Sequence, residues 1–260
     1  MTATVSLLTD FGPGSAYVGQ MHAVLRRLAP DARVVDLAHD CPAGHVEAAA
    51  YILRRSAPHF PEGTIHVVVV DPGVGTSRAV LAARTEDAYF IGPDNGVLAE
   101  AAADAEVRRI ESRALMAVEI APTFHGRDIM APVAARLALG MDLAEVGPRA
   151  EPLRVPPQRD LEAGGVTGRV LLADHFGNLV TNIPFELLAQ VGGPGGAVRV
   201  RIGAAFIDGL VETFADVAPG RALAYIGSGG NLEIAVNEGS AAEALGLGVD
   251  TEIRVEPGSR

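Results

Sequence analysis

The segment from Ile65 to Arg78, IHVVVVDPGVGTSR, places an acidic and a basic side chain directly after an apolar run. Asp71 ends a series of mostly β-branched residues, and Arg78 follows across a Pro-Gly-Val-Gly turn. The run predicts a strand buried on both faces of a parallel sheet, and ligands bind α/β sheets just beyond the carboxyl ends of strands. Asp71 and Arg78 are therefore candidates for chemistry, although a structural ion pair would use the same two residues.

Other polar clusters of the first half also follow apolar runs or precede a helix. If the strands are parallel, these clusters meet Asp71 at one edge of the sheet. Turn chemistry explains many of the same residue types, and we favour that reading for Asp94, Asn95 and Gly96. Taken alone, His125 is better explained as a loop residue than as a catalyst. The clusters are TDFG at 9–12, GPDNG at 92–96 and TFHGRD at 123–128.

The second half contains Gly-rich turns that carry amide and carboxylate side chains. Backbone N–H groups in such turns can hold a carboxylate, and amide edges suit a purine. A purine also needs an aromatic face, for which Phe124 and Phe214 are the candidates. The turns are DHFGN at 174–178, IGSGGN at 226–231 and NEGS at 237–240.

Composition excludes several classes of function. The chain has 260 residues, of which 48% are hydrophobic, enough for one large domain or two modest ones. Its net charge of -11 argues against a nucleic-acid partner. Every basic side chain other than histidine is arginine, and without lysine there is no Schiff-base chemistry and no P-loop lysine. The glycine spacings do not match a dinucleotide fingerprint, so no nicotinamide or flavin cofactor is expected.

The cysteine and histidine content predicts a protein of the reducing cytosol without a metal site. The lone Cys41 cannot form an internal disulfide. Neither a basic leader region nor a membrane-length apolar stretch is present, so we expect a cytoplasmic protein that does not enter a membrane. Cys41 lies near His39, Asp40 and His45, which are ligand types, but their spacing matches no standard zinc pattern.

The first half alternates between strand and helix signals, which predicts an α/β domain with a mainly parallel sheet over residues 1–150. Residues 151–166 are rich in Pro, Gly and charge and are expected to be a linker. Short strands then dominate residues 167–260, which predicts a smaller all-β, barrel-like domain with one helix near 184–191. In the first domain we expect helices at 19–28, 46–55 and 127–139, and one that follows Gly96 and ends near Ala103.

Five collinear segments between Val5 and Ala242 resemble the S-adenosyl-L-methionine (SAM) hydroxide adenosyltransferase family. They are TDFG, VVVDPGVGTSR, TFHGRDIMAPVAA, DHFGNLVTNI and IGSGGNLEIAVNEGSAA. The family is also called the SAM hydrolases and is related to the fluorinase and chlorinase. The resemblance implies an N-terminal α/β domain, a C-terminal β-barrel and a homotrimer. It also implies sites between the N-terminal domain of one subunit and the C-terminal domain of the next.

The resemblance further implies that Asp71, Arg78 and His125 are catalytic. Related halogenases replace this Asp with an aromatic residue and carry an extra loop, so the hydrolase branch is favoured here. The expected reaction is attack of water on the ribose C5′ of SAM, which gives adenosine and L-methionine without a further cofactor or metal. The alternatives are a chloride-using halogenase and a non-catalytic sensor of adenosine or SAM.

Substrate-binding residues are also implied by the resemblance. Asp10 should bind the ribose hydroxyls, while Asn178 and the Glu238 backbone bind the adenine. Asp174 and Ser228 should bind the methionine end. Two departures affect that end, since Ser15 stands where relatives often have Asp and Gly229 stands where halogenases have Arg.

Overall fold

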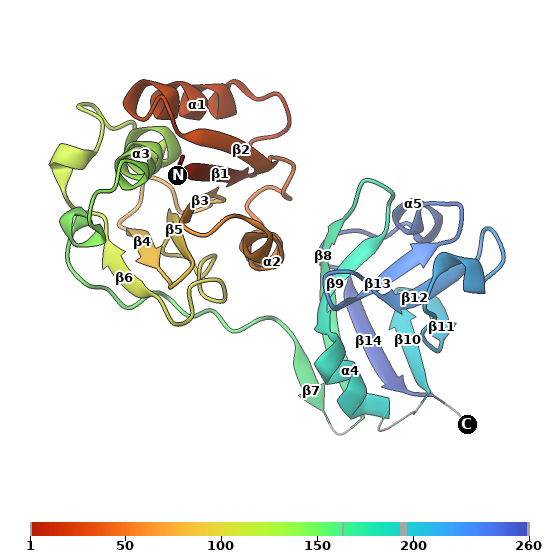
Figure 1. Ribbon diagram of the computed structural model, residues 1–260. Helices are drawn as coiled ribbons and strands as arrows, with labels where there is room; N and C mark the ends of the chain where they lie inside the picture. The colour runs from red at the N-terminus through yellow and green to blue at the C-terminus, as the bar shows by residue number, and fades with distance from the viewer. Residues whose placement is uncertain (1, 163, 193–196, 259–260) are drawn as a thin grey trace. The chain divides into compact units, whose positions relative to one another are not determined.

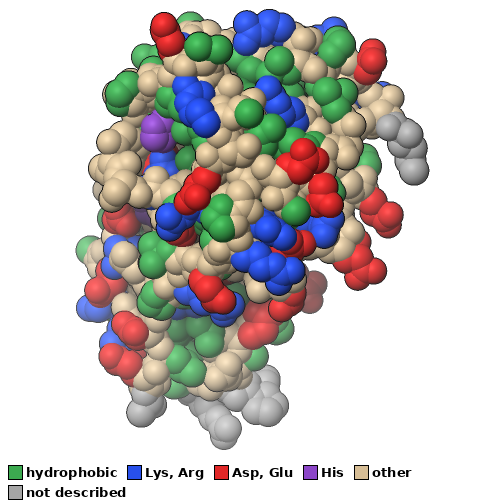
Figure 2. Space-filling view, turned by 90° about the vertical axis from the view of Figure 1, so that its left-hand side faces the viewer, with side chains coloured by type: hydrophobic (Ala, Val, Ile, Leu, Met, Phe, Trp, Pro, Cys, Tyr) green, Lys and Arg blue, Asp and Glu red, His purple; other side chains and the backbone are tan. Residues whose placement is uncertain are grey.

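A computed structural model describes residues 2–162, 164–192 and 197–258. The chain forms two compact units, of which the first ends at Val155 and the second begins at Pro156 (Figure 1). Across these three described stretches, no helix is both long and apolar enough to cross a membrane. On the face shown in Figure 2, arginine side chains are interspersed with acidic ones.

The first unit is built on a six-stranded sheet with the order β2-β1-β3-β5-β4-β6. The pairs β1–β2, β1–β3 and β3–β5 are parallel, whereas β4 runs antiparallel to both of its neighbours. The predicted mainly parallel sheet is therefore confirmed, with a reversal at β4. The strands are β1 (Thr4–Thr9), β2 (Arg33–Ala38), β3 (Thr64–Val69), β4 (Val80–Arg84), β5 (Ala88–Pro93) and β6 (Glu106–Arg109).

Buried strands and amphipathic helices hold this unit together. Every residue of β3 is buried, as its apolar run predicts, and every residue of β1 is buried as well. The helices are α1 (Ala16–Leu28), α2 (Val46–Ser56) and α3 (Ala131–Ala138), and α1 packs against α3. Met21 and Leu25 of α1 are fully buried, and the Ser15 hydroxyl caps its N-terminus by accepting from the Tyr17 amide.

Two of the predicted helices differ from the structure. No helix follows Gly96, because residues 97–104 form turns in which only Val97, Leu98 and Ala102 are buried, too little apolar surface to hold a helix. The predicted helix at 127–139 begins as a π-helical segment, η3 (Gly126–Met130), before α3. Pro132 cannot donate to the carbonyl of Asp128, which instead accepts from the Ala117 amide at 2.8 Å.

The second unit is an antiparallel, barrel-like sheet with the order β11-β10-β14-β8-β9-β13-β12, in which β7 pairs with β8. The ends of this path, β11 and β12, contact each other. The barrel interior is filled by buried aliphatic side chains such as Val166, Val200, Ile234 and Ile253. The strands are β7 (Asp160–Glu162), β8 (Gly165–Ala173), β9 (Leu179–Pro184), β10 (Val198–Ile202), β11 (Ala205–Asp208), β12 (Ala222–Ile226), β13 (Asn231–Val236) and β14 (Glu252–Pro257).

The second unit holds two helices where one was expected. The predicted helix is α4 (Phe185–Gly192), and the additional one is α5 (Ala241–Leu245). The Ser240 hydroxyl caps α5 by accepting from the Glu243 amide, and Gly246 ends it in the left-handed conformation. β7 also lies within residues 151–166, which were expected to be a linker.

Candidate active site

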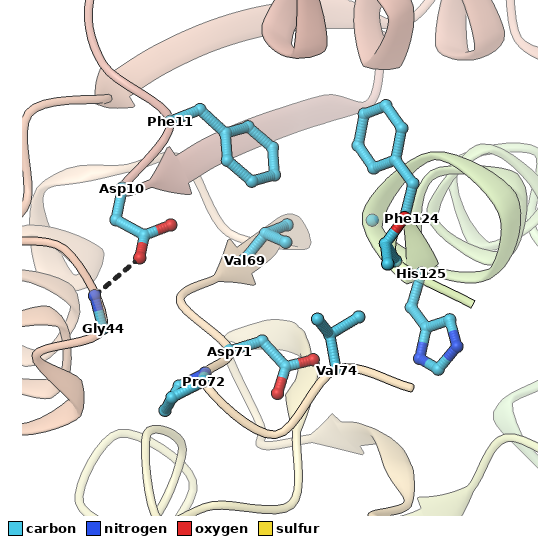
Figure 3. A pocket seen from close by; sticks show the side chains of 11 residues that line it. Asp10, Phe11, Gly44, Val69, Asp71, Pro72, Val74, Phe124 and His125 are labelled. Atoms are coloured by element: carbon cyan, nitrogen blue, oxygen red, sulfur yellow. Dashed lines mark hydrogen bonds between the residues drawn. The ribbon is translucent and has the colours of Figure 1, made fainter. Parts of the chain in front are cut away.

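The loops after β1 and β3 and the start of β4 meet at one edge of the first sheet. β1 and β3 are parallel, so their carboxyl ends coincide, and β4 runs the other way, so its amino end lies at the same edge. A cavity of about 190 Å³ opens there (Figure 3). It is lined by Asp10, Phe11, Gly44, Val69, Asp71, Pro72, Val74, Thr123, Phe124, His125 and Gly126. The structure thus brings Asp10, Asp71, Phe124 and His125 together in one cavity.

Asp10 is held at the cavity by the loop that precedes α2. Its Oδ2 accepts a hydrogen bond of 2.8 Å from the amide of Gly44 (Figure 3). Gly44 has a φ of 69°, a conformation that glycine adopts without strain, which lets its amide turn toward the carboxylate. The other oxygen of Asp10 keeps its capacity to accept from a ligand hydroxyl. Sequence reasoning missed Gly44, because its partner lies 34 residues away.

Asp71 and Arg78 form a buried ion pair. Nη2 of Arg78 donates to Oδ2 of Asp71, and Nη1 donates to the carbonyl of Ala79. The Asp71 and Arg78 side chains are 5% and 9% exposed. Oδ1 of Asp71 is buried and makes no well-aligned hydrogen bond within the described residues. One carboxylate oxygen is therefore fixed by Arg78, and the other keeps its lone pairs.

His125 completes the cluster, because Nη2 of Arg78 also lies 3.2 Å from Nδ1 of His125. A guanidinium only donates, so Nδ1 of His125 accepts and carries no proton. The neutral imidazole therefore bears its hydrogen on Nε2. Asp71 and Arg78 lie on the loop between β3 and β4, whereas His125 directly precedes η3, and the fold brings the three side chains that the resemblance implied into contact.

Burial of the cluster shifts the pKa values of Asp71 and His125. Burial raises the pKa of Asp71 above its ordinary value, while the positive charge of Arg78 opposes that shift. Burial and the charge of Arg78 both lower the pKa of His125 below its ordinary 6.5. At neutral pH the site therefore holds a neutral imidazole.

Aromatic side chains form one wall of the cavity. Phe11 and Phe124 pack edge to face with ring centroids 5.7 Å apart, and Tyr17 contacts both rings. The guanidinium of Arg127 covers Phe124 at 4.8 Å. Phe124 is only 7% exposed, so it builds the wall and offers little free ring face for stacking.

The remaining polar residues of the first unit have structural partners. Asn95 donates to the carbonyl of Val70 at 3.0 Å, and Asp94 accepts from the Leu153 amide at 2.7 Å. These contacts agree with the turn-forming role favoured for Asp94 and Asn95. His45 caps α2 by accepting from the Ala48 amide, and burial raises the pKa of Cys41 to about 12.

In the second unit, Asp174 organises the turn between β8 and β9. Its Oδ1 accepts from the amides of Phe176 and Asn178 at 2.9 and 2.8 Å, and its Oδ2 accepts from Asn178 Nδ2 at 2.9 Å. Gly177 accepts from the Ala242 amide at 3.0 Å, which brings this turn against the start of α5. Asp174 and Asn178 therefore lie together, and the loop that carries Glu238 leads directly into the same α5.

Phe214, Ser228 and Glu238 lie on three other loops of this unit. Phe214 is 39% exposed and packs on Tyr225 with ring centroids 5.2 Å apart. Ser228 follows β12, and Glu238 has a φ of 55°, a left-handed conformation that is uncommon outside glycine.

A residue that sequence reasoning missed, Glu233, lies beneath these loops. It is 9% exposed, and its Oε2 accepts from the Tyr225 hydroxyl at 2.5 Å. Burial raises the pKa of Glu233, and the charge of Asp174 raises it further. The signal was a single acid in the apolar strand segment NLEIAV, since a buried acid needs a partner.

Comparisons with known proteins agree with this architecture. Models of the N-terminal and C-terminal domains of SAM hydroxide adenosyltransferases match residues 5–147 and 168–254. An (R)-S-adenosyl-L-methionine hydrolase of Salinispora tropica is 42% identical over 99% of both chains, and a fluorinase of Actinopolyspora mzabensis is 27% identical over 96% of both. A crystal structure of an uncharacterized conserved protein from Thermotoga maritima superposes with a TM-score of 0.86 at 40% identity, covering 96% of this chain and 99% of the other. The chain therefore belongs to the SAM hydroxide adenosyltransferase family.

Proposed function

We propose that this protein hydrolyses SAM to adenosine and L-methionine. The observation that carries the proposal is the contact of the Arg78 guanidinium with both Asp71 and His125, two residues that line the cavity from separate segments. The cavity also presents Asp10, so its lining includes two carboxylates, and one of them, Asp71, is already paired with Arg78. Such a lining favours a cationic substrate, and SAM is a sulfonium.

In the proposed reaction, the oxygen of water bonds to the ribose C5′ as the C5′–S bond breaks. The bonding electrons stay on sulfur, which becomes the neutral thioether of methionine, and the water proton goes to a base. The sulfonium is already an activated leaving group. Lowering the pKa of water from 15.7 to about 7 in advance would require roughly 12 kcal/mol of anion stabilisation. We therefore propose that the water molecule loses its proton during the attack and not before it. Alignment of the water with C5′ lowers the activation barrier by several kcal/mol.

The hydrogen bonds divide the roles between the two candidate bases. The lone pair of His125 Nδ1 is directed at Arg78, and Nε2 carries the hydrogen, so the imidazole donates to the water and holds it. Oδ1 of Asp71 accepts no hydrogen bond from a side chain of the described residues, and burial raises the pKa of this carboxyl group against the opposing effects of Arg78 and the Gly73 amide. We assign Asp71 as the base and Arg78 as the group that orients it.

The remaining assignments follow the family resemblance. Asp10 binds the ribose hydroxyls through the oxygen that Gly44 leaves free. Asn178 and the Glu238 backbone bind the adenine, Phe214 offers a partly exposed ring, and Asp174 with Ser228 binds the methionine end. Phe124 supports the cavity wall. We also propose a homotrimer, which size-exclusion chromatography with light scattering tests.

The deciding experiment is incubation of purified protein with SAM in ¹⁸O-water, followed by chromatography with mass detection. We expect adenosine with the heavy oxygen at C5′, together with free methionine. The Asp71→Asn variant should lose about 10²- to 10⁴-fold in turnover, the usual contribution of a general base, while adenosine binding by calorimetry stays close to wild type. The exposed Asp31→Asn variant is the matched control.

Three outcomes would overturn all or part of this proposal. Formation of 5′-chloro-5′-deoxyadenosine in the presence of chloride would move the chain to the halogenase branch. Adenosine binding without any product would favour a sensor. Turnover retained in both Asp71→Asn and His125→Ala would remove the catalytic assignment of the trio.

A further inference from the structure

A second set of polar side chains lies behind the loop that carries Asp10, outside the cavity lining. Thr9 Oγ1 lies 2.9 Å from His39 Nδ1, and His39 Nε2 lies 3.1 Å from Asp36 Oδ1. The same oxygen of Asp36 lies 2.7 Å from His22 Nε2. The residues come from β1, β2, the loop after β2 and α1, so the set depends on the parallel pairing of β1 with β2.

Thr9 accepts one hydrogen bond and is placed to donate another. Its Oγ1 accepts from the Phe11 amide at 3.3 Å, so its hydroxyl hydrogen is available to donate to Nδ1 of His39. The other ring nitrogen, Nε2 of His39, lies 3.1 Å from the Asp36 carboxylate, close enough for a charge contact but not aligned for a hydrogen bond. The hydroxyl, imidazole and carboxylate thus form an ordered series, which we call the Thr9–His39–Asp36 relay.

Thr9 does not act as a catalytic nucleophile. Thr9 is 0% exposed, so its hydroxyl has no route to a substrate, and none of the three residues lines the cavity. What the relay contacts is the backbone of the loop from Thr9 to Gly12. His39 holds that loop twice, through its ring to Thr9 and through its carbonyl, which accepts from the Gly12 amide at 2.7 Å.

The loop held in this way delivers two groups to the cavity, the Asp10 carboxylate and the Phe11 ring (Figure 3). Gly44 fixes one oxygen of Asp10 from the far side, while the relay fixes the backbone on either side of Asp10. Misplacement by a fraction of an ångström would misalign the free oxygen of Asp10 with a ligand hydroxyl.

We propose that the Thr9–His39–Asp36 relay positions Asp10 for nucleoside binding, so that Thr9 and His39 are positioning residues for substrate affinity. This inference rests on the proposed function, in which Asp10 binds the ribose. Because the relay acts on binding and lies apart from Asp71, its loss should raise KM and leave kcat near its wild-type value.

The test compares Thr9→Val, which removes the hydroxyl at nearly constant volume, with Thr9→Ser, which keeps it. In Thr9→Val we expect KM for SAM and Kd for adenosine to rise about tenfold, the effect of one lost buried hydrogen bond. We expect kcat to stay within about twofold. Thr9→Ser should restore both constants. His22→Gln is the matched control, because His22 is the outer partner of Asp36 and its removal leaves the relay intact.

Amide hydrogen exchange of residues 10–14 supplies a readout that does not need activity. We expect faster exchange in Thr9→Val and wild-type exchange in Thr9→Ser and His22→Gln. If Thr9→Val does not fold, Asp36→Ala replaces it, since that side chain is 47% exposed and its loss should be tolerated.

The possible failures are distinguishable. If the wild type is active and Thr9→Val has the same KM and the same amide exchange as the wild type, the role of the relay is refuted. Equal defects in Thr9→Val and Thr9→Ser also overturn it, because the hydroxyl would then not be the operative group. If the wild-type protein neither binds adenosine nor consumes SAM, the proposed function is refuted. The role of the relay in substrate binding is then refuted too, whatever the exchange data show about the loop.

Discussion

Arg78 and His125 are joined side chain to side chain, with Nη2 of Arg78 3.2 Å from Nδ1 of His125. The arginine thereby fixes the tautomer of the histidine and opposes its protonation. The same guanidinium neutralises Asp71, so one cation sets the state of both candidate catalytic groups. The pH dependence and the stability of the protein both follow from this arrangement.

The first prediction concerns the acid side of the pH profile. Because burial and Arg78 lower the pKa of His125, the neutral form persists below the ordinary pKa of 6.5, and kcat/KM should fall only at pH values below it. In His125→Gln, the decrease of kcat/KM that comes from protonation of His125 should disappear. The decrease that comes from protonation of Asp71 should remain. Steady-state kinetics from pH 4.5 to 8.5 checks this, with the exposed His59→Gln variant as control. A limb that is unchanged in His125→Gln would refute the assignment.

The second prediction concerns the ion pair. Arg78→Met leaves the buried carboxylate of Asp71 without its partner and should lower the free energy of unfolding by about 3 kcal/mol or more. In the double variant Asp71→Asn/Arg78→Met the buried charge is gone, so we expect part of that loss to be recovered. Urea denaturation measures both. If the double variant is as unstable as Arg78→Met alone, the cost does not come from an unpaired charge.

The third prediction concerns His66, a fully buried residue of β3 that shares a hydrogen bond of 2.7 Å with Ser6 and stacks on Phe90. Burial lowers the pKa of His66 from 6.5 to about 4. Between these values the unfolded chain binds a proton that the folded protein does not, so stability rises with pH over this window. Stability should therefore be fully present above pH 6.5 and fall, by up to about 3 kcal/mol, as pH drops toward 4.

Chemical denaturation at several pH values measures this window. The Ser6→Ala/His66→Leu variant removes the titrating group together with its hydroxyl partner and should flatten the slope. His59→Gln, at an exposed histidine, should retain it. If the stability of Ser6→Ala/His66→Leu changes with pH as steeply as that of the wild type, the pH dependence comes from groups other than His66.

The fourth prediction concerns the turn between β12 and β13. A Cβ at Gly227 would overlap Oε1 of Glu233, whose other carboxylate oxygen, Oε2, accepts from the Tyr225 hydroxyl. Gly227→Ala should therefore displace the buried carboxylate and cost about 1–3 kcal/mol in stability. Gly248→Ala is the matched control, because a Cβ there meets no atom within 4 Å. Equal melting temperatures of the two variants would contradict the packing of Glu233 beneath this turn.

Much of the fold was predictable because it depends on local patterns. The apolar run of β3 predicted a strand buried on both faces of a parallel sheet, and short strands between turns predicted the barrel-like second unit. The failures were local patterns overridden by context. The alanine-rich segment after Gly96 forms turns because little of it is buried, and the helix expected from Arg127 begins as a π-helical segment in which the Ala131 amide donates to the carbonyl of Gly126.

The sequence by itself determined which residue types are available for chemistry and that the loops carrying them follow strands of an α/β sheet. The tertiary structure decided how these residues interact. Reversal of β4 placed Arg78 between Asp71 and His125, and pairing of β1 with β2 connected Thr9 to His39. Periodicity reports which face of a strand is buried. Strand direction, hydrogen-bond partners and the resulting pKa shifts depend on contacts between residues distant in sequence, which form only when the sheet is complete.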